Sequence, residues 1–303
     1  MQMVIEVRGL RKMYGSMVAV DDVSFDVAAG EIFGLLGPNG AGKTTTVECL
    51  QGLRHADGGQ MRVLGLDPWT QRASLRRRIG SQLQESALPD RLKVWEALDL
   101  FATAPLSRVK REQLLEQWGL ADKRNTSFAN LSGGQRQRLF VALALVNQPE
   151  IVFLDEMTTG LDPAARRATW DLIEAIGKRG TTVVLVSHFM DEVERLCQRV
   201  AVVNHGRIVA MDTPARLVEQ RSQQTRVLFT WDGEVLPRLE AVPHVYSVRQ
   251  QGSQIEVEGD GPVLQHVASA LLQQGIEPAD LRVERPTLEE VFLQIVGKPE
   301  EEQ

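Results

Sequence analysis

The sequence predicts an α/β protein in which residues 1–220 form a mainly parallel sheet covered by helices. Three continuous apolar runs, bounded by glycine or charged residues, lie at residues 32–36, 151–154 and 182–186. Runs of this kind are typical of central strands that are buried on both faces. Longer segments with helical spacing alternate with these runs, and that alternation favours strands joined by helices.

The first strand is expected at the N-terminus, where residues 1–7 alternate between apolar and polar side chains. Between residues 85 and 148 the strand signal disappears, and helical spacing is found instead at residues 94–101, 110–118 and 134–146. This part of the chain is therefore predicted to be a helical subdomain inserted into the α/β core.

The pattern changes again after residue 220. Strands are expected at residues 226–230, 246–250, 254–258 and 280–284, and helices at residues 235–242 and 263–273. This order matches the split βαβ pattern of ferredoxin-like domains. We therefore expect a small C-terminal α+β domain over residues 221–297, followed by an acidic, frayed tail at residues 298–303.

Composition argues against several classes of protein. The 303 residues include 34 basic and 40 acidic side chains, a net charge of −6, which does not suggest a nucleic-acid partner. No apolar stretch approaches the roughly 20 residues of a membrane-spanning helix, and no secretory leader is evident, so a cytoplasmic location is expected. Cys49 and Cys197 lie in helix-like patterns without companion ligands and are expected to be reduced thiols.

A glycine-rich segment with the spacing GxxxxGK[ST] follows the first apolar run and precedes a helical pattern. Its glycines let successive amide N–H groups point at phosphate oxygens, and the N-terminus of the next helix adds a positive dipole end. The preceding strand and the following helix are the context that this motif requires. The sequence therefore predicts a P-loop NTPase that binds ATP through Gly37, Pro38, Asn39, Gly40, Ala41, Gly42, Lys43, Thr44 and Thr45.

Four side chains in this part of the sequence suit the chemistry of a nucleotide bound with Mg²⁺. Lys43 is expected to reach the β- and γ-phosphates, and Thr44 to offer its hydroxyl to Mg²⁺. The apolar run at residues 151–154 ends in two carboxylates, from which a buried strand gains no stability. Asp155 is accordingly expected to hold Mg²⁺, and Glu156 to orient and polarise the attacking water.

The segment LSGGQRQR, residues 131–138, lies just ahead of another helical pattern. A serine hydroxyl and two glycines at a helix N-terminus can hold a γ-phosphate, so Ser132, Gly133, Gly134 and Gln135 are expected to bind nucleotide. Together with the P-loop, this segment resembles the signature of ABC ATPases. The resemblance extends over roughly residues 4–220 and implies a RecA-like core with a helical ABC subdomain.

The resemblance assigns roles to further residues. Tyr14 matches the aromatic side chain that stacks on adenine, and His188 matches the histidine that contacts the γ-phosphate. Gln84 matches the glutamine that joins the core to the helical subdomain and senses Mg²⁺ and water, although Gln82 is an alternative. Asp162 belongs to the loop by which two such subunits touch.

Two further features concern the place of the chain within this family. Met157 stands where the family usually has proline, so the backbone after Glu156 is less restricted than usual. The phrase RPTLEEVFL, residues 285–293, resembles the ending of ATP-binding subunits of bacterial drug and polysaccharide exporters.

The resemblance also implies partners. The signature segment of one subunit would complete the nucleotide site of a second copy, in a head-to-tail dimer held at the inner face of the cell membrane by a separate permease. Two alternatives are a soluble ABC ATPase that acts on a macromolecular complex and an assembly protein that binds ATP without turnover. The carboxylate of Glu156 argues against the second alternative, because a protein that only binds ATP has no need of a general base.

Overall fold

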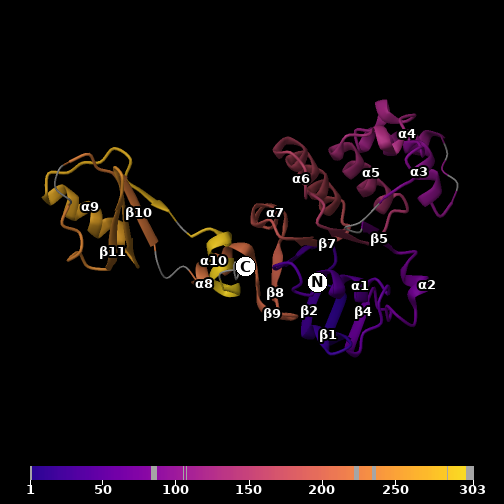
Figure 1. Ribbon diagram of the computed structural model, residues 1–303, viewed down its shortest axis with the longest axis horizontal. Helices are drawn as coiled ribbons and strands as arrows, with labels where there is room; N and C mark the ends of the chain where they lie inside the picture. The colour runs from indigo at the N-terminus through magenta and orange to yellow at the C-terminus, as the bar shows by residue number, and fades with distance from the viewer. Residues whose placement is uncertain are drawn as a thin grey trace. The chain divides into compact units, whose positions relative to one another are not determined.

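The computed structural model describes residues 2–82, 87–104, 106, 108–221, 225–233, 237–284 and 286–297. The chain forms two compact units, Met1–Pro214 and Ala215–Gln303 (Figure 1). The division falls earlier than the expected boundary after residue 220, because most of helix α8 (Pro214–Arg221) belongs to the second unit.

The first unit is built on a six-stranded sheet with the order β5-β6-β7-β3-β8-β9. The first five strands of this order are parallel, and β9 is antiparallel to β8. Every residue of the three predicted central strands is buried, which confirms that prediction. The strands are β3 (Ile32–Leu36), β5 (Ile79–Gln82), β6 (Ile151–Asp155), β7 (Thr182–Ser187), β8 (Arg199–Asn204) and β9 (Arg207–Asp212).

A second, antiparallel sheet with the order β2-β1-β4 was not expected. It consists of β1 (Met3–Tyr14), β2 (Met17–Ala28) and β4 (Gly58–Val63). The inner faces of both sheets share one apolar core, in which the rings of Phe25 and Phe33 stack at 5.2 Å between centroids. The prediction of a mainly parallel sheet is therefore correct only for the six-stranded sheet.

The helical subdomain has the elements that the sequence predicts, with ends shifted by at most a few residues. Its helices α3, α4 and α5 gather together, while α1 lies beside β1, β2 and β4 (Figure 1). Among the described residues, no helix is both long and apolar enough to cross a membrane. The helices of this unit are α1 (Lys43–Leu50), α2 (Arg72–Leu75), α3 (Val94–Phe101), α4 (Arg108–Gln117), α5 (Gly133–Leu145), α6 (Pro163–Lys178) and α7 (Met190–Leu196).

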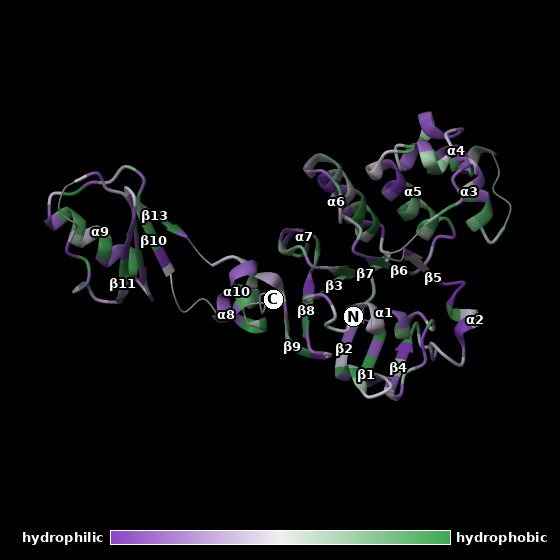
Figure 2. Cartoon of the chain, in the orientation of Figure 1, coloured by the Kyte–Doolittle hydropathy of each residue, from purple (hydrophilic) through white to green (hydrophobic). Residues whose placement is uncertain are grey.

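The second unit contains a four-stranded antiparallel sheet with the order β11-β12-β10-β13. Helix α9 (Val263–Gln273) has both hydrophobic and hydrophilic residues (Figure 2), and its buried residues join the core formed by β10 and β12. Helix α10 (Leu288–Val296) begins at a capping box made by Thr287 and Glu290. The strands are β10 (Thr225–Thr230), β11 (Val245–Gln251), β12 (Gln254–Gly259) and β13 (Arg282–Glu284).

The helix predicted at residues 235–242 is wrong for the part that the structure describes. Residues 237–242 form turns and irregular backbone. Pro237 has no amide hydrogen to donate, and Pro243 disfavours a helical conformation in the residue before it. The remaining residues between them are too few to form a stable helix.

Close packing of β5 against α5 fixes the helical subdomain on the sheet, and it depends on Gly80. A Cβ atom at this position would lie 2.0 Å from the carbonyl oxygen of Ala144 and 3.1 Å from Pro149 Cγ. Backbone atoms cannot move aside cheaply, so any side chain at this position would force β5 and α5 apart.

We expect Gly80→Ala to destabilise the protein by about 1–3 kcal/mol, as other overpacked cores are destabilised. Gly58→Ala is the matched control, because the added Cβ would meet only Arg11 Cβ at an ordinary 3.4 Å. Urea denaturation followed by tryptophan fluorescence measures both variants. Equal stability of the two would contradict the packing argument.

Candidate functional site

The carboxyl ends of three neighbouring parallel strands meet at one edge of the six-stranded sheet. Strand β7 lies between β6 and β3, with Asp155 opposite Val186 and Leu36 opposite Ser187. The glycine-rich segment follows β3, His188 follows β7, and Glu156 follows β6. The fold therefore brings three of the predicted motifs to the same edge.

Glycine is required at two positions of the P-loop. A Cβ atom at Gly37 would lie 2.2 Å from the carbonyl oxygen of Val203. Gly42 has a φ of 98°, and a Cβ atom there would lie 2.3 Å from the carbonyl oxygen of Ala19. The loop can therefore keep this curled backbone, and its close contact with β2 and β8, only without side chains at these positions.

Lys43 is held inside the P-loop. Its side chain is buried, and Nζ donates hydrogen bonds to the carbonyl oxygens of Gly37 at 2.8 Å and Pro38 at 2.9 Å. Burial lowers the pKa of Lys43, and the carboxylates of Glu156 and Asp155 oppose that shift. The ammonium group thus lies in the field of Asp155, the last residue of β6, and of Glu156, which follows it.

Asp155 joins the P-loop to β6. Thr44 Oγ1 donates a hydrogen bond of 3.1 Å to Asp155 Oδ2. The other oxygen, Oδ1, is buried and has no hydrogen-bond partner among the described residues. Burial raises the pKa of Asp155 to about 6, helped by Glu156 and opposed by Thr44 and Lys43. A carboxylate oxygen without a partner, next to a hydroxyl, is a donor set that fits a hard divalent cation.

Glu156 and His188 form a polar pair next to Asp155, with His188 Nδ1 3.3 Å from Glu156 Oε1. The backbone of Glu156 has a φ of 47°, a left-handed conformation that costs a non-glycine residue about 1–3 kcal/mol. Its amide donates to the carbonyl oxygen of Val186 at 2.9 Å, and the following Met157 is buried. The strained turn therefore places Glu156 at the edge beside His188.

The signature residues lie elsewhere, at the N-terminus of α5. Ser132 Oγ accepts a hydrogen bond from the amide of Gln135, and Gln135 Oε1 accepts one from the amide of Ser132. Ser132 and Gly133 are exposed, and Figure 1 shows α5 with α3 and α4, apart from α1. Among the described residues, the hydrogen bonds between Ser132 and Gln135 stay within the start of α5 and do not reach the P-loop.

Two other predicted residues have local roles that are visible in the structure. Asp162 caps α6 by accepting hydrogen bonds from the amides of Ala164 and Ala165, both at 3.0 Å. The hydrogen bond from the Ala165 amide is the main reason that the pKa of Asp162 is lowered. Tyr14 lies half exposed at the end of β1.

Sequence reasoning missed the cations around Tyr14. Lys12 Nζ lies 5.6 Å from the ring centroid, and the guanidinium of Arg54 lies 5.4 Å from it. Lys12, two residues away on the same strand, could have been found from the alternation of β1, but Arg54 comes near only through the fold. Gln84 lies outside the described residues, and its alternative Gln82 is buried at the end of β5.

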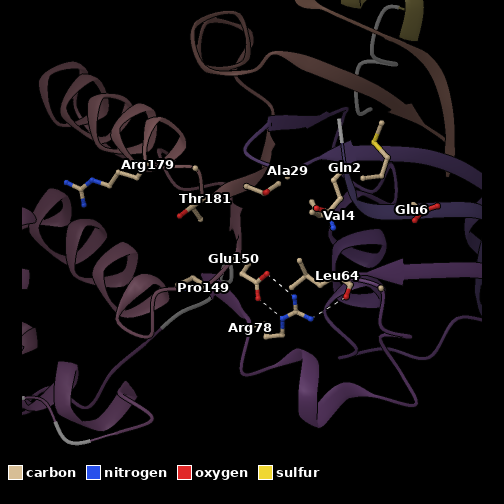
Figure 3. Close-up of a pocket in the computed structure, with 14 residues that line it drawn as sticks. Gln2, Val4, Glu6, Ala29, Leu64, Arg78, Pro149, Glu150, Arg179 and Thr181 are labelled. Atoms are coloured by element: carbon tan, nitrogen blue, oxygen red, sulfur yellow. Dashed lines mark hydrogen bonds and ion pairs between the residues drawn. The ribbon is translucent and has the colours of Figure 1, made fainter.

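A polar cavity of about 480 Å³ lies near the amino ends of β5, β6 and β7, the opposite edge from the P-loop. Figure 3 shows Arg78 in this cavity between Glu150 and Leu64. Arg78 donates hydrogen bonds to the carboxylate of Glu150 at 2.8 Å and to the carbonyl oxygen of Leu64 at 3.3 Å. The charges of Arg78 and Glu150 therefore neutralise each other. The phosphate-binding features of the sequence are not in this cavity.

The shifted carboxyl group makes the stability of the nucleotide-free protein depend on pH. Asp155 has a pKa of about 6 in the folded state, against an ordinary value of 3.8. Between these values Asp155 binds more protons in the folded state than in the unfolded state, so its contribution to stability should fall as pH rises from about 4 to about 6.

We expect the Asp155→Asn protein to lack this fall in stability between about pH 4 and about pH 6, and to be more stable than the parent at pH 7. Urea denaturation in EDTA, at pH values from 4 to 7, measures the difference between the two proteins. Curves that run parallel over this range would contradict the assigned cause.

Comparisons with known proteins agree with this geometry. A family described as ABC transporter matches residues 20–159. The chain is 36% identical over 302 residues to the daunorubicin resistance ATP-binding protein DrrA3 of Streptomyces coeruleorubidus, covering 97% of this chain and 96% of that one. It is 37% identical over 303 residues to the Nod factor export ATP-binding protein I of Burkholderia pseudomallei (strain 1710b), covering 97% of each.

Solved structures give the same result for the fold. An ATP-binding subunit of an ABC transporter superimposes with a TM-score of 0.65 at 28% identity, covering 72% of this chain and 92% of that one. A dimeric ATP-binding cassette bound to ADP and phosphate superimposes with a TM-score of 0.61 at 24% identity, covering 69% and 98%. The chain belongs to the ATP-binding proteins of ABC transporters, the subunits that hydrolyse ATP to power transport.

Proposed function

We propose that this chain hydrolyses ATP bound with Mg²⁺ at the carboxyl edge of its six-stranded sheet, and thereby drives export through a separate membrane permease. The observation that carries the proposal is the meeting of cation, hydroxyl and carboxylates at that edge. The side chains concerned are those of Lys43, Thr44, Asp155, Glu156 and His188.

ATP binding would rest on Lys43, on the N-terminus of α1 and on the ring of Tyr14. The ammonium of Lys43 donates to two P-loop carbonyl oxygens, and phosphate oxygens of a bound triphosphate would take their place as stronger acceptors. The α1 N-terminus adds its dipole to the attraction of phosphate. The exposed ring of Tyr14 would stack on adenine, which contributes affinity for any purine rather than base choice.

Thr44 and Asp155 would hold Mg²⁺. The orphaned Asp155 Oδ1 supports this assignment, because a buried carboxylate oxygen otherwise lacks compensation for its lost hydration. The described residues contain no cluster of three His, Cys, Asp or Glu side chains fit for a metal, so the remaining ligands would come from phosphates, water and Gln84, which lies outside the described residues. When bound, Mg²⁺ supplies positive charge that neutralises the phosphates.

Glu156 is the proposed general base. Its side chain is mostly buried yet lies at the edge next to Lys43, where it would accept a proton from the attacking water. His188 lies 3.3 Å from it and would hold the Glu156 carboxylate in position while contacting the γ-phosphate. Gln84, from outside the described residues, is proposed as a further ligand of the water and of Mg²⁺.

The site is proposed to be completed by a second copy of the chain. ABC ATP-binding subunits act in pairs together with membrane permeases, and Ser132 with its neighbours is exposed at the N-terminus of α5, where the helix dipole favours an anion. In a head-to-tail dimer, Ser132, Gly133, Gly134 and Gln135 of one copy would approach the γ-phosphate held by the other. Asp162, at the start of α6, would lie in the contact between the copies.

A hydrophobic cavity of about 490 Å³ is the proposed docking place of the permease. It is formed by β5, by residues that follow α1 and by residues of α3 and α5, so it joins the core to the helical subdomain. Leu53 and Phe101 are 41% and 46% exposed there, which would favour covering by a partner. The apolar lining consists of Leu53, Ile79, Ala87, Leu88, Phe101, Phe140 and Leu143.

Export is the proposed direction of transport, because the relatives are named for daunorubicin resistance and for Nod factor export. A drug-like, lipid-like or polysaccharide-like substrate would fit those names. Docking on the permease would place the chain at the inner face of the cell membrane.

The second unit is proposed to be a reduced ferredoxin-like domain. Its strand order, β11-β12-β10-β13, and its antiparallel pairing support that assignment. Helix α9 packs on the sheet, while residues 237–242 stand where a first helix is expected. We propose residues 221–297 as the extent of this domain.

Two substitutions separate nucleotide binding from turnover. Lys43→Ala removes a charge that contributes about 1.5–3 kcal/mol per charge-assisted hydrogen bond, so ATP affinity should fall about tenfold or more. Glu156→Gln keeps the size of the side chain but cannot take up a proton, so ATP should bind as in the parent while hydrolysis collapses.

Equilibrium ATP titration and phosphate release measure the two effects. Glu174→Gln, a change at a partly exposed residue of α6 outside the proposed site, serves as the control for mutation of a glutamate. Unchanged ATP affinity in Lys43→Ala would refute the P-loop assignment. Substantial turnover in Glu156→Gln would move the catalytic role to another residue.

A further inference from the structure

A fully buried carboxyl group, that of Glu192 on α7, lies behind the catalytic edge and is not used by the proposed chemistry. Trp170 Nε1 donates a hydrogen bond of 3.0 Å to Glu192 Oε1. Burial raises the pKa of Glu192, while Ser187, Trp170 and Thr158 oppose that shift as hydrogen-bonding neighbours. Thr158 Oγ1 and Glu192 Oε2 are themselves buried without a hydrogen bond of good geometry in the described part of the chain.

The neighbours of Glu192 belong to the segments that carry the site. Thr158 lies two residues after Glu156, in the turn that follows β6. Ser187 directly precedes His188 at the end of β7, and its Oγ accepts a hydrogen bond of 3.0 Å from the amide of Phe189.

The third neighbour of Glu192, Trp170, connects it to the helix that follows the proposed dimer contact at Asp162. Trp170 lies in α6, the helix that begins at Asp162. Glu192 therefore bonds to α6 through Trp170, and the hydroxyl groups that lower its pKa belong to the turns that carry Glu156 and His188.

Stability alone does not account for a carboxyl group at this position. Burying an ionisable group costs free energy that hydrogen bonds only partly return, and an apolar side chain of similar volume is often as stable or more so. Buried polar groups can instead specify one arrangement of the segments around them. The left-handed backbone at Glu156 makes such an arrangement necessary, because a strained turn persists only when its surroundings hold it.

We propose that Glu192 is a positioning residue that sets the spacing between Glu156 and His188 and ties both to α6. The proposal rests on the proposed roles of Glu156 and His188 in hydrolysis. Glu192 itself touches neither nucleotide nor water.

The proposal predicts a change in kcat without a change in ATP binding. Glu192→Leu keeps a similar volume but removes the hydrogen bond to Trp170 and the polar group beside Thr158 and Ser187, so the two catalytic turns lose the carboxyl group that they share. Misplacement of a reacting group by about 1 Å can cost on the order of a hundredfold in rate, so we expect kcat to fall at least about tenfold. The P-loop lies on β3 and α1, so the dissociation constant for ATP should stay within about twofold of the parent.

Glu192→Gln provides the rescue. Its amide oxygen can accept from Trp170, and its amide NH₂ can donate to the hydroxyl of Thr158 or Ser187. We therefore expect this variant to keep most of the parent kcat. Thr169→Val is the matched control, because Thr169 is a buried polar residue of α6 whose hydroxyl, among the described residues, bonds only within its own helix, to the carbonyl oxygen of Ala165. Its kcat should equal that of the parent.

The experiment measures ATP titration and steady-state phosphate release for the full-length chain and each variant. A tenfold loss of kcat in Glu192→Leu, with intact ATP binding and recovery in Glu192→Gln, supports the proposal. An unchanged kcat in Glu192→Leu overturns it. Loss of kcat and of binding sites in the same proportion also overturns it, because a purely structural role lowers the folded fraction and affects both equally.

Two further measurements keep the test decisive. If Glu192→Leu does not fold, Thr158→Val removes one hydroxyl group with little change in volume, and Trp170→Phe removes the indole N–H together with part of the ring. A lower kcat with normal ATP binding supports the proposal, and a normal kcat in both overturns it. Glu156→Gln is measured in parallel, because substantial turnover in that variant refutes the proposed function itself, whatever Glu192 does.

Discussion

The hydrogen bond between Thr44 and Asp155, 3.1 Å long, is the interaction on which the site depends. It joins the first turn of α1, the helix that follows β3, to the end of β6. Strands β3 and β6 are not neighbours, because β7 lies between them. The bond is possible only because parallel register brings the ends of these strands to one edge. Burial of Asp155 and Lys43 at this edge removes the hydration of their charged groups. Bound Mg²⁺ and phosphate would compensate Asp155 and Lys43, respectively, for that loss.

The parts of the fold that the sequence predicted well are those whose signal is local. The residues of β3, β6 and β7 are apolar without alternation because both faces of a parallel sheet are covered, and a single sequence shows this directly. The P-loop was predictable because Gly37 and Gly42 are required by backbone contacts that no other residue tolerates. Roles for Tyr14, Gln84 and His188 came only from resemblance.

The parts that escaped prediction depend on contacts between distant segments. The antiparallel sheet arises when β4 pairs with β1, for example Val63 with Ile5, and nothing local to either strand specifies the other. Residues 235–242 have the apolar spacing of a helix, but Pro237 within this range and Pro243 directly after it disfavour helical backbone. Glu192 looks like an ordinary polar residue in an amphipathic helix, and only the fold shows that it is buried against Trp170.

The carboxyl edge of the six-stranded sheet supplies only half of the proposed site. The other half is the segment around Ser132, which caps α5 in another part of the same unit and would come from a second copy of the chain. The most direct test mixes two inactive chains, one with Lys43→Ala and one with Ser132→Arg. In a head-to-tail dimer of the two, one site combines the intact P-loop of the second chain with the intact signature of the first. We expect an equal mixture to recover about a quarter of the parent ATPase rate. About half of randomly formed dimers are mixed, and each mixed dimer has one intact site of its two. A mixture as inactive as its components would contradict this expectation.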